Sequence, residues 1–328
     1  MGLKANVSEN RTYTKGVIAL LLSALLTATS QVFYASHVQN MHPFIFTGIS
    51  FFLTACYFSF FARNQKVEYK WKSTWKSLLK LNLSSVLAFM GFYFALKFIE
   101  PAIVSSLEMG LGPLFVIFLA LTQRQFIVKA QWGIALGTLL ACFLLIISIF
   151  NGNSAVQMNQ NTNTILGVIA SVFCGLGAVL CTSYSKQLSS AGWTSSMILT
   201  HRFYGIVLLS FIFTYDILFD FFFDNVLWIL LVTIAGVLIP MYLLQKGIQY
   251  CETFLVMMSL CFVPVFTFFF QLFDPRLSWS TTTLIGVILL FLLGVFSIYV
   301  EKNKLTIIDS FKSEFSRAKS DLKSKKGY

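Results

Sequence analysis

Ten apolar runs, each long enough to cross a bilayer as a helix, dominate this chain. A hydrocarbon core about 30 Å thick needs about 20 apolar residues in helical conformation. Only 11% of the 328 residues are charged, and the mean hydropathy is +0.76. The runs are residues 16–36, 43–62, 77–97, 101–121, 130–150, 164–185, 194–215, 226–246, 252–273 and 280–300. The sequence therefore predicts an all-α integral membrane protein with ten transmembrane helices, and it argues against a soluble globular enzyme.

Lys and Arg residues are distributed unevenly between the connecting segments. With the N-terminus on the cytoplasmic side, the inside segments hold 21 of the 24 basic residues. The outside segments hold only Lys97 and Arg276, and Arg202 lies within a span. Because cytoplasmic loops carry the excess of basic residues, we expect an integral cytoplasmic (inner) membrane protein with both termini cytoplasmic. The net charge of +11 fits an anionic membrane surface, so nucleic acid is not an expected partner.

Two short sequences recur at one spacing. Gly16-Val-Ile-Ala returns at Gly167, and Pro113-Leu-Phe returns as Pro264-Val-Phe, in both cases 151 residues later. This indicates a duplicated five-span unit, and because five is odd, the second copy crosses the membrane inverted. The expected organisation is a cytoplasmic N-terminal segment 1–15, a first five-helix repeat 16–150, an external linker 151–163, a second repeat 164–300, and a basic amphipathic cytoplasmic tail 301–328. Inverted repeats are typical of secondary transporters.

The chain resembles the EamA-type ten-span exporters of the drug/metabolite transporter superfamily over about residues 16–300. The resemblance rests on Ala95-Leu96-Lys97, Pro113-Leu114-Phe115, Lys246, Pro264-Val265-Phe266 and Arg276-Leu277-Ser278, and Arg202 is similar to the family's intramembrane arginine. It implies a central cavity lined by spans one, three and four and their repeat partners. The repeat counterpart of Arg202 is Phe51, so the first half lacks a matching arginine. Gly110-Leu111-Gly112 stands where members that export aromatic amino acids carry bulky aromatics, which argues against that substrate class.

Glu108 is the most informative residue of the sequence. It lies about 10 Å into the fourth span at 1.5 Å per residue, where an ionised carboxylate is costly. Ser105, Gly112 and Phe115 share its helical face. Glu108 is therefore either a proton or cationic-substrate site, or a structural acid that is hydrogen-bonded or ion-paired between helices.

Arg202 and His201 lie near each other early in the seventh span. Arginine stays charged, so Arg202 needs an anion or a path to water. It is either a counter-ion for Glu108 or a substrate carboxylate, or a residue that braces helices, and we expect the bracing role because family members carry it whatever their substrate. His201 is expected to be an interhelical histidine.

Polar and aromatic stripes predict the rest of the pathway. The first span carries Ser23, Thr27, Ser30, Gln31 and Tyr34 on one face, and the third carries Asn82, Ser85, Phe89 and Tyr93. Each stripe either lines a pathway or joins helices by hydrogen bonds. The residues expected in the substrate pathway or coupling are Glu108, Gln31, Tyr93, Ser105, Gly112, Phe89 and Met258, and those expected in structural or counter-ion roles are Arg202, His201, Pro113 and Pro264.

The leading interpretation is a secondary active transporter that exports a small metabolite or amino-acid-like compound by alternating access, with proton coupling as one option. The alternatives are an uptake or exchange carrier and a membrane sensor or scaffold without flux. No catalytic motif of the HExxH, GxSxG or P-loop type occurs. We therefore expect no enzyme activity, no cofactor and no metal, and the partners are a small molecule and the bilayer. The oligomeric state is left open.

The predicted topology can be tested with reporter fusions. A reporter that is active only in the cytoplasm should work when fused after Tyr328 and fail when inserted in 151–163. A reporter active only outside should give the opposite pattern at the same two positions, which controls for expression. Activity of the cytoplasmic reporter in 151–163 would contradict the topology and, with it, the inverted repeat.

Overall fold

The computed structural model describes residues 2–38, 43–63, 71–125, 127–150, 161–217, 226–274 and 279–300, and these form a bundle of long helices without strands. Its helices are α1 (Gly2–Val38), α2 (Pro43–Ala62), α3 (Trp71–Ala95), α4 (Pro101–Thr122), α5 (Lys129–Phe150), α6 (Asn161–Ser190), α7 (Ser195–His201), α8 (Tyr204–Thr214), α10 (Val226–Thr233), the π-helical segment η1 (Ile234–Leu238), α11 (Ile239–Tyr250), α12 (Thr253–Leu260), α13 (Val263–Gln271) and a last helix, Thr281–Val300. The ten predicted spans coincide with ten helical segments that are long and apolar enough to cross a membrane, which confirms the all-α fold class.

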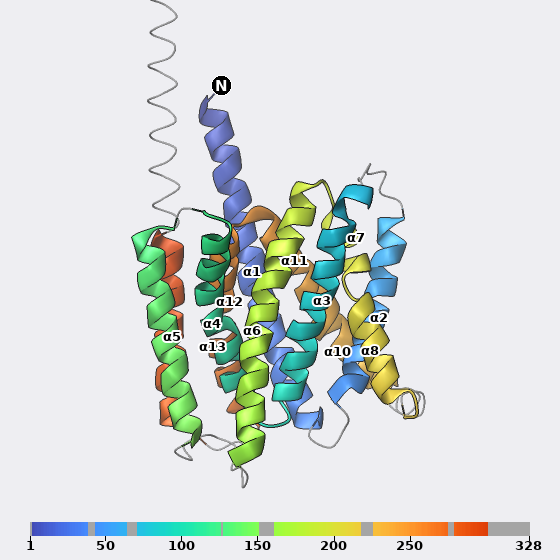
Figure 1. Ribbon diagram of the computed structural model, residues 1–328, viewed down its shortest axis with the longest axis vertical. Helices are drawn as coiled ribbons and strands as arrows, with labels where there is room; N and C mark the ends of the chain where they lie inside the picture. Colours follow the sequence, from blue (N-terminus) through green and yellow to red (C-terminus); the bar gives the residue numbers. More distant parts are fainter. Residues whose placement is uncertain are drawn as a thin grey trace, which may run out of the picture.

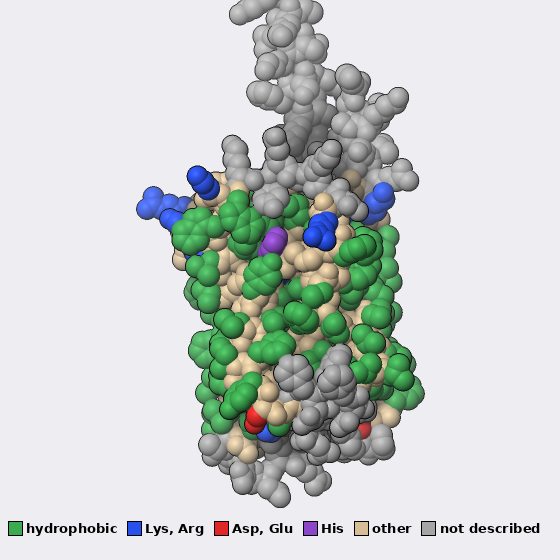
Figure 2. Space-filling view, turned by 90° about the vertical axis from the view of Figure 1, so that its right-hand side faces the viewer, with side chains coloured by type: hydrophobic (Ala, Val, Ile, Leu, Met, Phe, Trp, Pro, Cys, Tyr) green, Lys and Arg blue, Asp and Glu red, His purple; other side chains and the backbone are tan. Residues whose placement is uncertain are grey.

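The segments run alternately up and down, so that both ends of the described chain lie at the same end of the bundle (Figure 1). The lateral face seen in Figure 2 carries mainly apolar side chains and no Lys or Arg in its middle, and the visible Lys and Arg side chains gather mainly at the end where α1 begins. An apolar girdle with basic residues at one end is the surface that a bilayer requires. Residues 151–160 of the expected linker 151–163 and the tail at 301–328 lie outside the described residues, and residues 161–163 belong to α6 rather than to a linker.

Two helices begin earlier than their apolar runs. The helix α1 begins at Gly2 rather than near residue 16, and neither Pro nor Gly interrupts residues 3–15. The helix α3 begins at Trp71 rather than at 77, and its added turns carry exposed Trp and Lys side chains. Such residues suit the boundary between lipid and water, so the helix continues where the apolar run does not.

Three of the spans are not regular α-helices. The seventh breaks between α7 and α8 at Arg202 and Phe203, and the ninth breaks between α12 and α13, just before Pro264. The eighth contains η1 directly before Pro240. A proline ring clashes with the carbonyl group four residues earlier, which explains the two irregularities next to proline. Pro113 has a milder effect, because α4 remains one continuous helix through it.

The helices pack in a small number of extensive pairs. The most extensive contact joins α3 to α6, and others join α1 to α11 and α4 to α6. Small residues allow the closest approaches: a Cβ atom on Gly177 of α6 would lie 2.6 Å from the backbone nitrogen of Ala88 on α3. Close backbone contact through glycine is typical of helix pairs in membranes, where van der Waals packing replaces the hydrophobic effect.

The contact at Gly177 predicts the effect of an added methyl group on stability, and Gly133 of α5 provides a control. Gly177→Ala should lower the free energy of unfolding by about 1–3 kcal/mol, because the added methyl group meets fixed backbone. Gly133→Ala in α5 should be neutral or stabilise slightly, because nothing lies within 4 Å of its added Cβ and alanine favours helix. The midpoint of thermal unfolding of the two purified variants measures the difference. A Gly177 variant as stable as the Gly133 variant would disprove the tight contact.

Candidate functional site: a central cavity

A cavity lies in the middle of the bundle, between the walls formed by α1, α3, α4, α6 and α11. The volume open to the centre of a water molecule in this cavity is about 80 Å³, several times the volume that one water needs. Its polar and charged lining residues are Ser23, Thr27, Ser30, Gln31, Tyr93, Glu108, Thr182 and Arg202. Its apolar lining includes Phe51, Phe89, Phe92, Met109, Met241 and Leu260.

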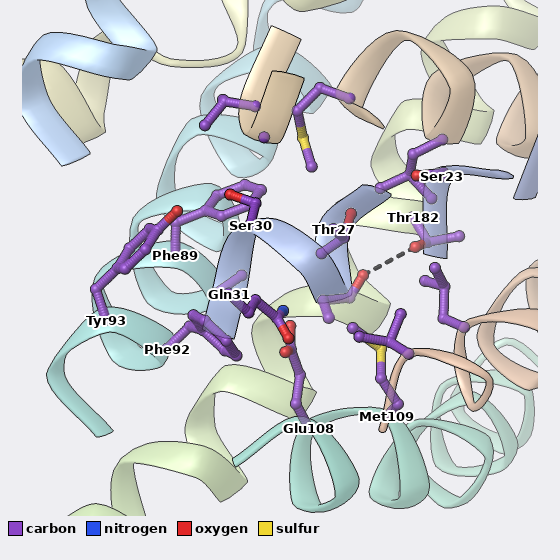
Figure 3. Close-up of a pocket in the computed structure, with 18 of the residues that line it drawn as sticks. Ser23, Thr27, Ser30, Gln31, Phe89, Phe92, Tyr93, Glu108, Met109 and Thr182 are labelled. Carbon is purple, nitrogen blue, oxygen red and sulfur yellow. Dashed lines mark hydrogen bonds between the residues drawn. The ribbon is translucent and has the colours of Figure 1, made fainter. Parts of the chain in front are cut away.

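Glu108 reaches this cavity from α4 and is 7% exposed. Figure 3 shows its carboxyl group pointing toward the side chain of Gln31 on α1. The thiol of Cys174 on α6 lies within hydrogen-bonding reach of the carboxyl group. That thiol also has the Ala88 carbonyl oxygen at 3.0 Å, so its single proton serves one acceptor at a time. Within the described residues, Glu108 forms no ion pair, so it is not held as half of a salt bridge.

Gln31 connects the cavity to a polar cluster on two other helices. Its side-chain oxygen accepts a hydrogen bond of 2.7 Å from the Ser105 hydroxyl and one of 3.2 Å from the Thr267 hydroxyl. Ser105 itself is fully buried and does not line the cavity, so it acts on the site through Gln31. These bonds fix Gln31 beside Glu108.

The first-span stripe both lines the cavity and joins helices. Ser23, Thr27, Ser30 and Gln31 all face the cavity, as Figure 3 shows. The Ser23 hydroxyl also donates a hydrogen bond of 2.8 Å to the Pro240 carbonyl oxygen in α11. The two interpretations of the stripe therefore hold at once.

Aromatic rings lie between the cavity and the end of the bundle where α3 ends. Tyr93 lines the cavity, and the Tyr34 ring stacks edge-on against it at 4.7 Å between ring centroids. The ring centroid of Phe46 lies 4.6 Å from that of Tyr34 and 5.4 Å from that of Trp228. Tyr34 and Phe46 are buried, and this aromatic cluster (Tyr34, Phe46, Tyr93 and Trp228) packs beside the cavity on that side.

Arg202 stands at the break in the seventh span. Its Nε atom donates a hydrogen bond of 3.0 Å to the Ser85 hydroxyl of α3. The guanidinium carbon lies 5.5 Å from the ring centre of Phe89 and 5.8 Å from that of Phe203. The side chain is 2% exposed and faces the cavity.

Asn82 binds the backbone groups that this break releases. Its side-chain nitrogen donates a 2.8 Å hydrogen bond to the His201 carbonyl oxygen, and its side-chain oxygen accepts a 3.1 Å bond from the Gly205 backbone N–H. Lipid offers no partner for such groups, so the break requires one from a neighbouring helix. The third-span stripe therefore has two roles: Asn82 and Ser85 hold the seventh span, and Phe89 and Tyr93 line the cavity.

The structure also locates the remaining predicted residues. Gly112 abuts Met257 and does not line the cavity, and Met258 is fully buried and does not line it either. His201 contacts the Tyr204 hydroxyl at 2.6 Å and packs edge-on against the rings of Trp71 and Trp193. Pro113 and Pro264 lie in buried helix. Within the described ranges, no group of three or more His, Cys, Asp or Glu side chains comes together to hold a metal ion.

Several lining residues were not singled out from the sequence. Thr182, Leu244 and Leu260 are the positions 151 residues after Gln31, Tyr93 and Met109, so the repeat spacing could have found them. Phe51, which the sequence marked only as the repeat counterpart of Arg202, also lines the cavity. Phe92 and Met241 carried no signal that distinguishes them from core residues of other apolar helices.

A ten-span helical bundle with a partly polar cavity at its centre is an architecture typical of membrane transporters. The comparisons with known proteins agree. The model of the EamA-like transporter family matches residues 14–147. The match supports the resemblance over residues 14–147: this part of the chain is similar to the EamA-like transporter family, and the likeness points to transport rather than catalysis.

Solved structures add support for the fold. A crystal structure titled only "Crystal structure of protein" superposes with a TM-score of 0.61 at 15% identity, covering 90% of this chain and 98% of that one. Altogether 15 solved chains match. At this identity the likeness concerns the fold alone. No curated protein matches the chain in sequence.

The hydrogen bonds of Asn82 generate a prediction about the break. Asn82→Leu preserves much of the side-chain volume but leaves the His201 carbonyl and the Gly205 N–H without their partner, so we expect a loss of about 1–3 kcal/mol in unfolding free energy. Ser77→Ala, which removes an exposed hydrogen bond from the same helix, should change stability by less than about 0.5 kcal/mol. Thermal unfolding in detergent compares the two. Equal stability of both variants would show that the break does not depend on Asn82.

Proposed function

We propose that the protein is a secondary transporter that carries a small metabolite through the central cavity by alternating access. The observation that carries the proposal is the cavity itself, a site with an acid, a base and several hydroxyl groups in the middle of an apolar bundle. Polar groups at this depth are costly unless they serve a solute, an ion or water. A solute of metabolite size fits such a site better than a protein partner does.

We further propose that residues 16–150 and 164–300 are inverted repeats. Five pairs of cavity-lining residues are separated by the spacing of 151: Thr27 and Ala178, Gln31 and Thr182, Phe51 and Arg202, Tyr93 and Leu244, and Met109 and Leu260. The packing supports the same relation. At a spacing of 151 residues, α3 corresponds to the span that contains α11, and α1 corresponds to α6, so the contact of α3 with α6 has its counterpart in the contact of α11 with α1. A repeat of this kind provides two equivalent conformations, one open to each side.

We propose an orientation and a direction from charge. The basic residues favour cytoplasmic termini and a location in the inner membrane. The aromatic cluster then lies toward the outside, and the packing of its rings beside the cavity on that side suits loading from the cytoplasm. This supports export of a metabolite or an amino-acid-like compound over uptake.

We propose Glu108 as the group that couples transport to protons. It is the acid that lines the cavity, it is nearly buried, and Gln31 and Cys174 surround it without an opposite charge in contact. A carboxyl group that exchanges its proton for substrate at such a site would drive export by letting protons return inward.

Transport can be tested without knowing the substrate. Metabolites that accumulate inside cells lacking the protein, and outside cells that overproduce it, should be identified by mass spectrometry. Each should then be loaded into proteoliposomes to measure efflux. Accumulation in the opposite compartments would establish uptake or exchange instead, and no difference in any metabolite would contradict a transport function.

The coupling role predicts a separation of two activities. Glu108→Gln keeps the shape of the side chain but fixes it as neutral, so proton-driven net efflux should fall to background while exchange of substrate for substrate, measured at saturating substrate, continues. Efflux and counterflow in the same proteoliposomes measure the two activities. Glu252→Gln, which changes an acid outside the cavity, is the control and should leave both unchanged. A Glu108 variant whose efflux still follows the pH gradient would exclude this residue from coupling.

A further inference from the structure

Arg202 has fewer partners than a bracing arginine needs. Of its five N–H groups, one is used in the bond to Ser85, and the terminal nitrogen Nη1 is buried without a hydrogen-bond partner. Within the described part of the chain, no carboxylate forms an ion pair with it. The Phe89 and Phe203 ring centres lie 5.5 and 5.8 Å from the guanidinium carbon and 6.3 Å from each other, so both rings lie on the same side of the guanidinium group.

An unpaired guanidinium in this position favours binding of an anion. Arginine cannot lose its proton, and a buried charge is costly until it is paired and hydrogen-bonded. The planar fork of N–H groups matches a carboxylate in two parallel hydrogen bonds. Because Arg202 lines the cavity, a carboxylate on a bound solute can reach the groups that the protein leaves unpaired.

Glu108 lies at a different depth of the same cavity. It is seven residues from the beginning of α4 at one end of the bundle, and Arg202 is seven residues from the beginning of α7 at the other. At 1.5 Å per residue, each lies about 10 Å from its own end. The two charged side chains therefore enter the cavity on helices that begin at opposite ends of the bundle, and within the described residues no ion pair joins them.

We infer that the transported solute is a small amphoteric molecule whose carboxylate binds Arg202 and whose ammonium group binds Glu108. This inference rests on the proposed transport function and specifies its substrate class. It also accounts for exchange with protons: a solute ammonium group and a proton compete for the Glu108 carboxylate, so only one of them is carried in each half of the cycle. An anion without an ammonium group would not compete in this way.

The inference can be tested by ligand-induced stabilisation of the purified full-length protein. Three pools of matched compounds are needed: small aliphatic amino acids, the amines formed by removing their carboxyl groups, and the acids formed by removing their amino groups. The amino-acid pool should raise the thermal unfolding midpoint by several degrees, and each of the other pools by less than half as much. Arg202→Gln should reduce the response to amino acids to the level of the amines, and Glu108→Gln should reduce it to the level of the acids.

A variant that keeps the charge covers the case in which Arg202→Gln does not fold. Arg202→Lys retains a cation but loses the planar fork, so its response to acids and amino acids should weaken while its response to amines stays unchanged. Equal responses to the three pools, or no response to any, would overturn the inference. Efflux of a solute that is not amphoteric, in the metabolite experiment, would overturn it while leaving the transport function intact.

Discussion

The absence of water from the hydrocarbon layer is the constraint on which this structure depends. Each backbone polar group must find a partner inside the bundle, and each charge must reach either an end of the bundle or an internal cavity. The chain meets this requirement with long helices wherever the sequence permits. Where the seventh span breaks at Arg202, the side chain of Asn82 replaces the missing helical partners of His201 and Gly205. The position of Arg202 in the cavity is thus secured by a neutral amide on another helix.

The sequence predicted the helices well because lipid leaves few alternatives. Twenty apolar residues bounded by charges have essentially one stable form in a bilayer, and all ten such runs are helical. It also marked Glu108, Gln31, Phe89 and Tyr93, which the structure brings together, because polar or aromatic stripes on apolar helices have few reasons to exist. Pattern alone was enough for these elements.

What could not be predicted depends on distances between helices. The sequence did not reveal whether Arg202 meets a carboxylate, because that depends on how α7, α3 and α4 are spaced. Gly112 and Met258 follow the same periodicity as lining residues, yet they face neighbouring helices. Periodicity defines a face of a helix, but only packing decides whether that face meets a cavity or a neighbour.

The close glycine contacts divide the bundle into two blocks. Gly177 and Gly175 hold α6 against Ala88 of α3 and the backbone of Glu108 in α4. On the other side, Gly247 of α11 lies against Leu20 of α1. Backbones packed as closely as that of α6 against α3 and α4 cannot slide past each other without separating, so these three helices form one tightly packed block, whereas α11 packs on α1 through the Leu20 side chain. The cavity lies along the seam between the two blocks. In the alternating-access cycle proposed above, a rocking of α1 and α11 against the block of α3, α4 and α6 would open the cavity to either side and leave the packing of those three helices intact.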